Sequence, residues 1–184
     1  MEYVEAIKKV DDIQAIKHYL KQHSLRDYLL FVMGINTGLR ISELLNLKWE
    51  DVLENEKNDI KEFLEVTSLP PVFINRQVQN SISEYLNQYS PNMDQYIFQS
   101  KKMVAPITRQ QAYRIINRAA KEVGIPYKIG THTLRKTFGY HAFQKGIAIS
   151  LLQKIFNHAS SSETLRYLGV KKCKNTPVKI DVNL

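Results

Sequence analysis

The sequence predicts an α+β domain that is mainly α-helical and has a small three-stranded antiparallel sheet. Only 7 Gly and 6 Pro interrupt the 184 residues, and apolar side chains recur mostly at helical spacing. Only between residues 49 and 74 do short, β-like runs replace that spacing. The length fits one domain, so we expect residues 1–184 to form a single unit.

The N-terminal part of the chain predicts three helices. Asp11 or Asp12 caps the first, which Ser24 separates from the second, because short polar side chains accept the free N–H groups of a first turn. Gly38 ends the second helix, and residues 41–45 form a short third one.

Three segments predict the strands of the sheet. They read WEDVL (49–53), EFLEV (62–66) and PVFI (71–74), and each combines apolar or β-branched residues with short length. The pair Pro70-Pro71 marks a turn or the start of a strand, where proline's missing N–H does no harm.

Helical spacing resumes after residue 75. A brief extended piece interrupts it at 96–98, and Thr108 caps a long helix that ends at Glu122. The final stretch, 171–184, is basic and forms a tail or an arm. The helices expected in this half of the chain cover residues 76–89, 109–122, 133–144, 149–156 and 162–168.

Charge is distributed unevenly. The chain has a net charge of +8, but residues 1–66 carry −4 and residues 67–184 carry +12. Such segregation favours a polyanionic partner, although charges that scatter over the surface of an ordinary basic protein are the alternative. No apolar run is long enough to span a membrane, and the charged N-terminus does not resemble a signal peptide.

The cysteine content points to a reducing compartment. Because Cys173 is the single cysteine, the chain cannot form an internal disulfide or a zinc site with several cysteine ligands. With no membrane partner implied, we expect a cytoplasmic protein.

Familiar nucleotide and hydrolase motifs are missing, but three polar clusters stand out. The first places Arg40 at a helix start with Glu43 one turn later, and the second sets His132 and Arg135 at i, i+3 spacing. The third is His158 at a helix end, with a tyrosine nine residues further on. Each alone has a structural reading, as a surface ion pair, a helix cap or a core tyrosine.

Taken together, these clusters resemble the catalytic domain of the tyrosine recombinases, or phage integrases. The resemblance spans residues 10–170. It is strongest in TGLRISELLNLKWEDV (37–52), HTLRKTFGYH (132–141) and LLQKIFNHASSSETLRYLG (151–169). Their order and intervals make the match far more specific than any single arginine motif.

The resemblance implies a site and a reaction that needs no cofactor or metal. A tyrosine attacks a phosphodiester of double-stranded DNA and forms a 3′-phosphotyrosine bond. This covalent bond conserves the energy of the phosphodiester, so that the strand can later be rejoined. Two arginines clamp the phosphate, one histidine acts as general base, and the position that is His or Trp in the family donates a further hydrogen bond. By position these residues are Tyr167, Arg40 and Arg135, His132, and His158, with Glu43 supporting the first arginine.

The resemblance also implies an assembly. Recombination uses four protomers on two duplexes, so we expect a homo-tetramer on DNA and a monomer when the protein is free. Residues 170–184 are the candidate segment that packs on a neighbour, or else a basic tail. Family members often carry an N-terminal DNA-binding domain, which we expect to be absent from this chain.

One departure from the family pattern concerns a lysine. The family's general-acid lysine lies in the turn between the second and third strands, but no lysine occurs between Lys61 and Lys101. Residues 50–65 are also acidic, with seven carboxylates and two lysines. Either the turn is shortened, or Lys61 or Lys57 substitutes, or the protein cleaves DNA poorly.

Two alternative functions follow from this departure and from the basic charge. One is a non-catalytic or weakly active DNA-binding relative that has lost the lysine. The other is an RNA-binding or regulatory helical protein whose arginines only position phosphates.

Overall fold

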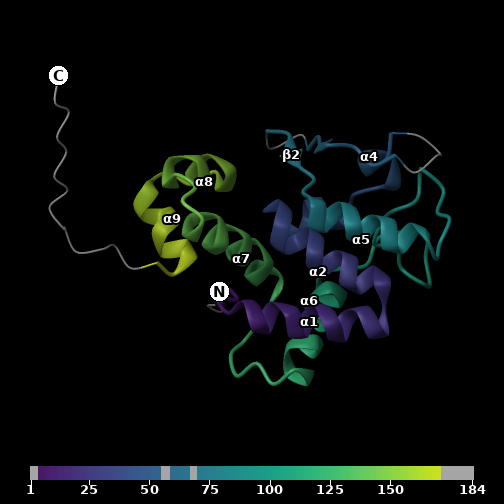
Figure 1. Ribbon diagram of the computed structural model, residues 1–184, viewed down its shortest axis with the longest axis horizontal. Helices are drawn as coiled ribbons and strands as arrows, with labels where there is room; N and C mark the ends of the chain where they lie inside the picture. The colour runs from purple at the N-terminus through teal and green to yellow at the C-terminus, as the bar shows by residue number, and fades with distance from the viewer. Residues whose placement is uncertain (1–3, 55–58, 67–69, 171–184) are drawn as a thin grey trace, which may run out of the picture.

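A computed structural model describes residues 4–54, 59–66 and 70–170, and helices dominate it (Figure 1). None of the helices in these ranges is long and apolar enough to cross a membrane. The helices are α1 (Val10–His23), α2 (Leu25–Thr37), α3 (Ile41–Leu45), α4 (Trp49–Val52), α5 (Arg76–Leu86), α6 (Arg109–Glu122), α7 (Thr131–Gln144), α8 (Ile149–Phe156) and α9 (Ser161–Leu168). The strands are β1 (Phe63–Leu64) and β2 (Val72–Phe73).

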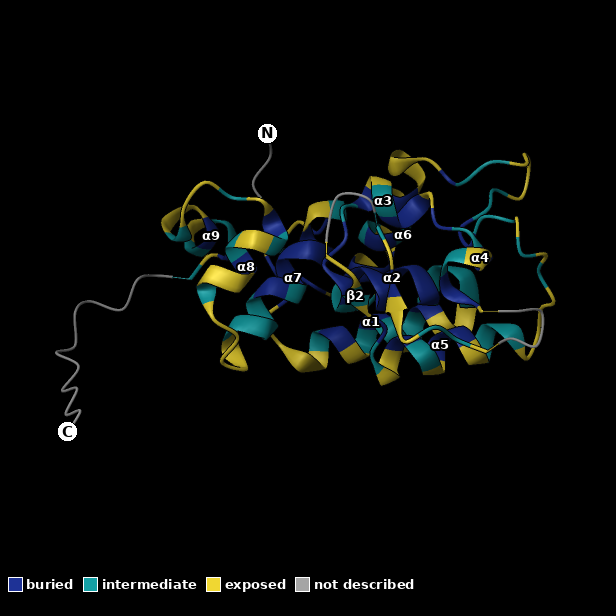
Figure 2. Cartoon of the chain, turned by 90° about the horizontal axis from the view of Figure 1, so that it is seen from above, coloured by how far each residue is buried: buried dark blue, intermediate teal, exposed yellow. Residues whose placement is uncertain are grey.

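Helix α2 forms the centre of the molecule. Its run from Leu29 to Gly34 is buried on every side, as expected for a helix surrounded by others, and it packs against α1, α5 and α7. Figure 2 shows α2 and much of α7 in the dark blue of buried residues. A side chain on Gly34 would place its Cβ only 2.5 Å from Leu134 Cδ1, so the glycine allows α7 to approach closely.

A second, smaller group of helices forms one end of the molecule. Helices α7, α8 and α9 enclose a cluster built from Leu152, Phe156 and Leu168, and they lie together in green and yellow in Figure 1. Gly139 of α7 faces this cluster, because a Cβ there would lie 2.5 Å from Phe156 Cζ and 2.6 Å from Leu168 Cδ2. Close packing of the three helices therefore depends on that glycine.

The sheet within the described residues has two strands rather than the three predicted. β1 and β2 pair antiparallel, with Phe63 opposite Phe73 and Leu64 opposite Val72. The predicted strand at 49–53 is wrong for most of its length, since residues 49–52 form α4. Asp51 explains this, because its Oδ2 accepts the Lys48 backbone N–H at 2.7 Å and so caps a helical turn. Only Leu53 pairs, in an isolated bridge to Ile60.

The expected fold class is confirmed, and most helices begin or end within three residues of the prediction. Helix α1 begins at Val10, which leaves Asp11 and Asp12 in its first turn rather than at its cap. Helix α7 begins two residues earlier than predicted, because the Thr133 hydroxyl accepts the Gly130 N–H and extends the first turn. Helix α9 begins one residue early, at Ser161, and α5 ends at Leu86.

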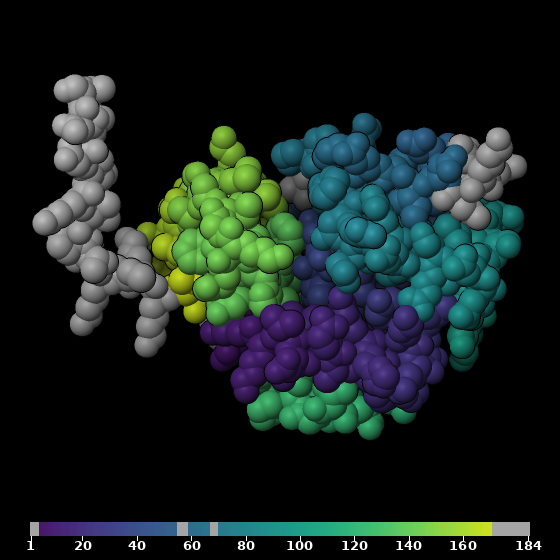
Figure 3. Space-filling view, in the orientation of Figure 1, coloured from purple at the N-terminus to yellow at the C-terminus, as the bar shows by residue number. Residues whose placement is uncertain are grey.

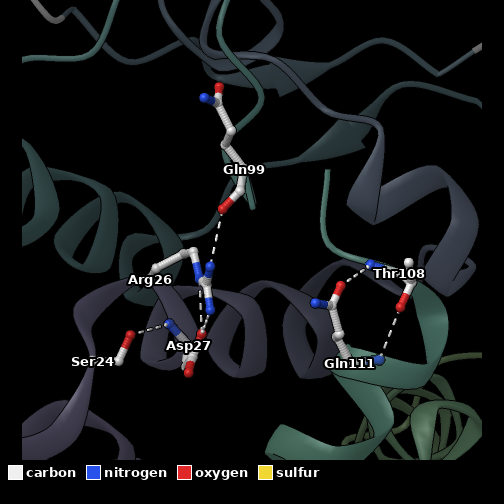
Figure 4. A network of polar contacts seen from close by, with 6 residues as sticks. All are labelled: Ser24, Arg26, Asp27, Gln99, Thr108 and Gln111. Carbon is white, nitrogen blue, oxygen red and sulfur yellow. Dashed lines mark hydrogen bonds and ion pairs between the residues drawn. The ribbon is translucent and has the colours of Figure 1, made fainter. Parts of the chain in front are cut away.

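Two polar networks fix the start of α2 and of α6 (Figure 4). Arg26 holds Asp27 through two hydrogen bonds and donates from Nη1 to the Gln99 carbonyl at 2.9 Å, which ties a distant loop to α2. At α6, Thr108 and Gln111 cap each other, with backbone-to-side-chain hydrogen bonds of 2.7 and 3.1 Å. The cap sets the direction of the first turn of α6, which begins with Arg109.

Candidate active site

The five predicted site residues line one pocket of about 270 Å³. They come from four separate stretches of the chain: the start of α3, the first half of α7, the loop after α8, and α9. A pocket of this volume accommodates a phosphate group with its two ester oxygens. The lining consists of Arg40, Ile41, Ser42, Arg109, Thr131, His132, Arg135, Phe156, His158 and Tyr167.

Arg40 stands at the start of α3 and is oriented by Glu43. The Arg40 backbone N–H donates to Glu43 Oε2 at 2.7 Å, and Nη1 of the side chain donates to Oε1 at 3.1 Å. The carboxylate is more enclosed than the guanidinium, with side-chain exposures of 14% and 41%. Glu43 therefore fixes one edge of the arginine and leaves the other edge to the pocket.

Arg135 is a buried cation whose donors are incompletely used. Its residue is only 8% exposed, Nη2 donates to the Ile155 carbonyl at 2.9 Å, and the guanidinium lies 5.1 Å from the centre of the Phe156 ring. Within the described part of the chain, Nε is buried and has no hydrogen-bond partner. Burial, and to a lesser extent Arg40, lowers the pKa of Arg135. An anion in the pocket would satisfy both the charge and the vacant donor.

His132 is kept neutral by its surroundings. Burial lowers its pKa below the ordinary value of 6.5, and the nearby cations Arg109, Lys136 and Arg135 lower it further. A neutral imidazole has a nitrogen lone pair that can accept a proton.

His158 follows α8, at a sharp reversal of the chain. Asn157 adopts a left-handed conformation with φ of 56°, and the His158 N–H then donates to the Gln153 carbonyl at 3.0 Å. The ring nitrogen Nδ1 lies 3.0 Å from the Thr164 hydroxyl of α9, which fixes the imidazole. Burial lowers the pKa of His158, Glu163 raises it and Arg135 lowers it.

Tyr167 packs among these groups. Its ring meets the His158 ring edge-on, at 5.0 Å between centroids and 69° between planes, and lies 5.3 Å from the Phe156 ring. Burial raises the pKa of the phenol, whereas Arg135 and Arg40 lower it. The charges of the two arginines thus act on the tyrosine.

The lysine that the family pattern calls for is not found in this pocket. Lys61 donates its Nζ to the Glu50 carbonyl at 2.7 Å, and the described residues that line the pocket include no lysine. The other candidate, Lys57, and residues 67–69 of the turn lie outside the described residues.

Sequence reasoning missed Arg109 as a pocket residue. It is exposed at the first turn of α6 and lines the pocket together with His132. The Thr108 capping signal located the helix start, but only the packing of α6 against α7 brings that start to the pocket.

Comparisons with known proteins identify relatives of this chain. The model of the phage integrase family matches residues 8–173. The chain is 41% identical over 170 residues to the probable integrase/recombinase YoeC of Bacillus subtilis strain 168, with 92% of each chain covered. It is 31% identical over 150 residues to a tyrosine recombinase of Pseudothermotoga lettingae, covering 79% of this chain but 50% of that protein. The chain thus spans nearly all of the first relative and half of the second.

Solved structures show the same fold. The XerA recombinase superposes with a TM-score of 0.74 at 24% identity, covering 94% of this chain and 62% of the other. A lambda integrase dimer bound to a COC′ core site gives a TM-score of 0.66 at 18% identity, covering 98% of this chain and 65% of the other. With a family match over nearly its whole length and this fold, the chain belongs to the phage integrase family and carries its tyrosine recombinase catalytic domain.

Proposed function

We propose that this protein performs site-specific DNA recombination by cleaving and rejoining strands through a covalent phosphotyrosine. The observation that carries the proposal is Arg135, a buried cation with a vacant Nε donor beside Tyr167, in a pocket shared with Arg40 and two histidines. Leaving a buried donor without a partner is costly, so this arrangement is expected where a ligand supplies the missing acceptor.

The scissile phosphate binds between the two arginines. Arg40 and Arg135 neutralise its non-bridging oxygens, and these planar, always-charged forks suit phosphate geometry. Because Arg135 is water-excluded and Arg40 is held by Glu43, the donors need little reorganisation when charge develops on the phosphate. His158 adds a hydrogen bond from the Tyr167 side.

Tyr167 is the nucleophile. Its hydroxyl loses a proton to the neutral His132, directly or through the phosphate, and Arg135 and Arg40 stabilise the phenolate. The phenolate oxygen forms a bond to phosphorus while the bond to the 5′-oxygen breaks, and that oxygen takes up a proton from water and leaves as a hydroxyl. The reverse reaction, with a 5′-hydroxyl from another strand, rejoins the DNA and frees the tyrosine.

The partner is duplex DNA, bound by the basic residues of the second part of the chain. We propose that four copies assemble on two duplexes, that the free protein is a monomer, and that residues 1–184 act as one catalytic domain. Such binding weakens steeply with salt, by roughly 10³ between 50 and 200 mM for about six phosphate contacts.

The test traps the covalent intermediate. Duplexes bound by the protein are selected from a random pool, and each is then nicked near its centre so that the released 5′-end diffuses away and cleavage becomes irreversible. The wild-type protein is expected to form a denaturation-resistant protein–DNA adduct, whereas Tyr167→Phe forms none. Tyr113→Phe, an exposed tyrosine of α6, serves as the matched control and keeps wild-type yield.

Two outcomes would contradict the proposal. Binding of the selected duplex without any adduct would indicate a non-catalytic DNA-binding relative. Preferential binding of RNA over the same duplex at fixed salt would indicate the RNA-binding alternative.

A further inference from the structure

Helix α7 also holds the segment that precedes α1. Lys136 donates from Nζ to the Val4 carbonyl, and the Ile7 N–H donates to the Thr137 hydroxyl, each at 2.9 Å. His141 Nε2 lies 2.9 Å from the Ile7 carbonyl. These contacts span more than 125 positions of sequence, so residues 4–7 form a strap along α7, and in Figure 3 the purple N-terminal surface abuts the yellow-green helices.

Tyr167 lies between the strap side of α7 and the pocket. The Nζ of Lys136 is 5.1 Å from the centroid of the tyrosine ring, close enough for a cation–π contact. The space between the strap and α9 is a void of only about 10 Å³, bordered by Glu5, Lys136 and Tyr167. That volume holds one water molecule at most, so the ring has little room to retreat from the pocket.

Lys136 contacts the tyrosine from outside the pocket. Its residue is 8% exposed, and it is not among the residues that line the pocket with Arg40 and Arg135. A direct role on the phosphate or on the departing oxygen is therefore not what its position offers. It acts on the site through the Tyr167 ring and through its charge, which helps to lower the pKa of His132.

We propose that Lys136 is a positioning residue for Tyr167, and that the strap at residues 4–7 sets the position of Lys136. The inference rests on the proposed function, in which Tyr167 is the nucleophile. The strap then links whatever precedes residue 4 to the reacting group through two contacts: the Val4 carbonyl with Lys136, and Lys136 with the tyrosine ring. A displacement of the N-terminal segment would therefore change the alignment of Tyr167 without any direct contact between that segment and the arginines.

The first experiment replaces Lys136 and follows adduct formation at saturating nicked duplex, on the pH-independent plateau of the rate, so that a change in the pKa of His132 does not contribute. Lys136→Met keeps the length and apolar stem but removes the charge, and it is expected to slow adduct formation about 10-fold to 100-fold, the usual effect of a misplaced reacting group. Duplex affinity stays unchanged, because Lys136 lies outside the pocket. Lys136→Arg restores a cation over the ring and recovers most of the rate.

The matched control is Lys8→Met. Lys8 also belongs to the N-terminal segment and places its Nζ 5.6 Å from a tyrosine ring centroid, but that ring is Tyr140 of α7. The rate of this variant is expected to equal that of the wild type. Equal losses in Lys8→Met and Lys136→Met would overturn the proposal, and so would a wild-type rate in Lys136→Met or a loss that appears entirely in duplex affinity.

A second variant addresses the strap. His141→Phe removes the polar contact with the Ile7 carbonyl but keeps an aromatic ring. We expect it to slow adduct formation, as Lys136→Met does. Because both act on one contact chain, the double variant should be slower by less than the product of the two effects. Effects that multiply fully would separate the strap from Lys136 and contradict the coupling.

A measurement without DNA separates failure of this inference from failure of the proposed function. The protein carries ¹³C at the tyrosine Cζ atoms, and the signal of Tyr167 is the one missing from Tyr167→Phe. Lys136→Met should shift the Tyr167 signal, since the ammonium over its ring is lost, whereas Lys8→Met should leave that signal in place. An unchanged signal overturns the positioning role even if the wild-type enzyme is active. A shifted signal supports the role even if no adduct forms, in which case it is the proposed function that fails.

Discussion

Two regions of the molecule differ in how closely they pack and in what they bring to the pocket. One consists of helices α7, α8 and α9, and the other of residues 46–75. Helices α7 and α9 and the loop after α8 supply His132, Arg135, Tyr167 and His158, and the three helices pack so closely that Gly139 has no space for a side chain. The described residues of the 46–75 region form the four-residue helix α4 and two strands of two residues each, and the stretch 50–65 is acidic, with seven carboxylates to two lysines. Arg40, at the start of α3, joins the pocket from outside both.

Most of the candidate catalytic groups therefore belong to the first region, and the second region has a supporting role. Four of the five candidate groups depend on the packing of three helices, so their geometry is fixed by the core beneath them. The hairpin is anchored by Leu64 and Ile74, which are fully buried, while Phe63 and Phe73 on the other side are about half exposed. We therefore expect changes in α7–α9 to affect activity and stability strongly, and changes in the hairpin to affect the leaving group at most.

The largest effect is expected at the arginines. Arg135→Gln should lower the single-turnover rate of adduct formation by about 10²–10³, the usual cost of one preorganised donor to a developing anion. Arg40→Gln should lower it toward the smaller end of that range, because Arg40 is more exposed and water can replace part of its role. A loss at Arg40 that exceeded the loss at Arg135 would reverse this ranking of the two.

Restoring a lysine in the hairpin is the next test. Ser68→Lys places a lysine between β1 and β2 in the sequence, where the family pattern has its general acid, although residue 68 lies outside the described residues. If the chain lacks a general acid, adduct formation should rise by up to about 10². Lys61→Met is the control, with no change expected, since Lys61 binds the Glu50 carbonyl. A large loss in Lys61→Met would make Lys61 the general acid instead.

Stability should divide along the same line. Gly139→Ala forces a Cβ to within 2.6 Å of Phe156 and Leu168 atoms, and overpacking of this kind destabilises a fold by about 1–3 kcal/mol. Phe73→Ala, at a side chain about half exposed, should change the free energy of unfolding by about 0.5 kcal/mol or less. Denaturant unfolding of both variants measures this difference in the free energy of unfolding. Similar losses in the two variants would show that the hairpin is coupled to the core as strongly as helices α7–α9 are.

The smallest effect concerns pH. Because the pKa of His132 is lowered, the base is unprotonated through neutral pH, and the rate should fall only as the pH drops below 6.5. Arg109→Gln removes one of the cations that lower this pKa, so the acid limb of the rate profile should move to higher pH. The measurement is the rate of adduct formation against pH at saturating duplex. An unchanged limb would mean that His132 is not the base.

The sequence predicted the helical part of the fold and every one of the five pocket-lining candidates, because both follow from local patterns. Apolar spacing determines where a helix lies, and Arg40, His132, Arg135, His158 and Tyr167 fall at family-like intervals. Tertiary contacts are not encoded locally, and they account for the misses. The pattern at Trp49–Val52 predicted a strand, but these residues form a helical turn because the Asp51 carboxylate caps it. Arg109 reaches the pocket only through the packing of α6 against α7.

The most direct test of the central claim is to map the protein–DNA bond. The adduct trapped on the nicked duplex is digested with protease and nuclease, and the linked peptide is identified by mass spectrometry. The account predicts a peptide that contains Tyr167, joined through its phenol oxygen to a 3′-phosphate, with a free 5′-hydroxyl on the released strand. A bond to any other side chain, or a 5′-phosphate linkage at Tyr167, would contradict it.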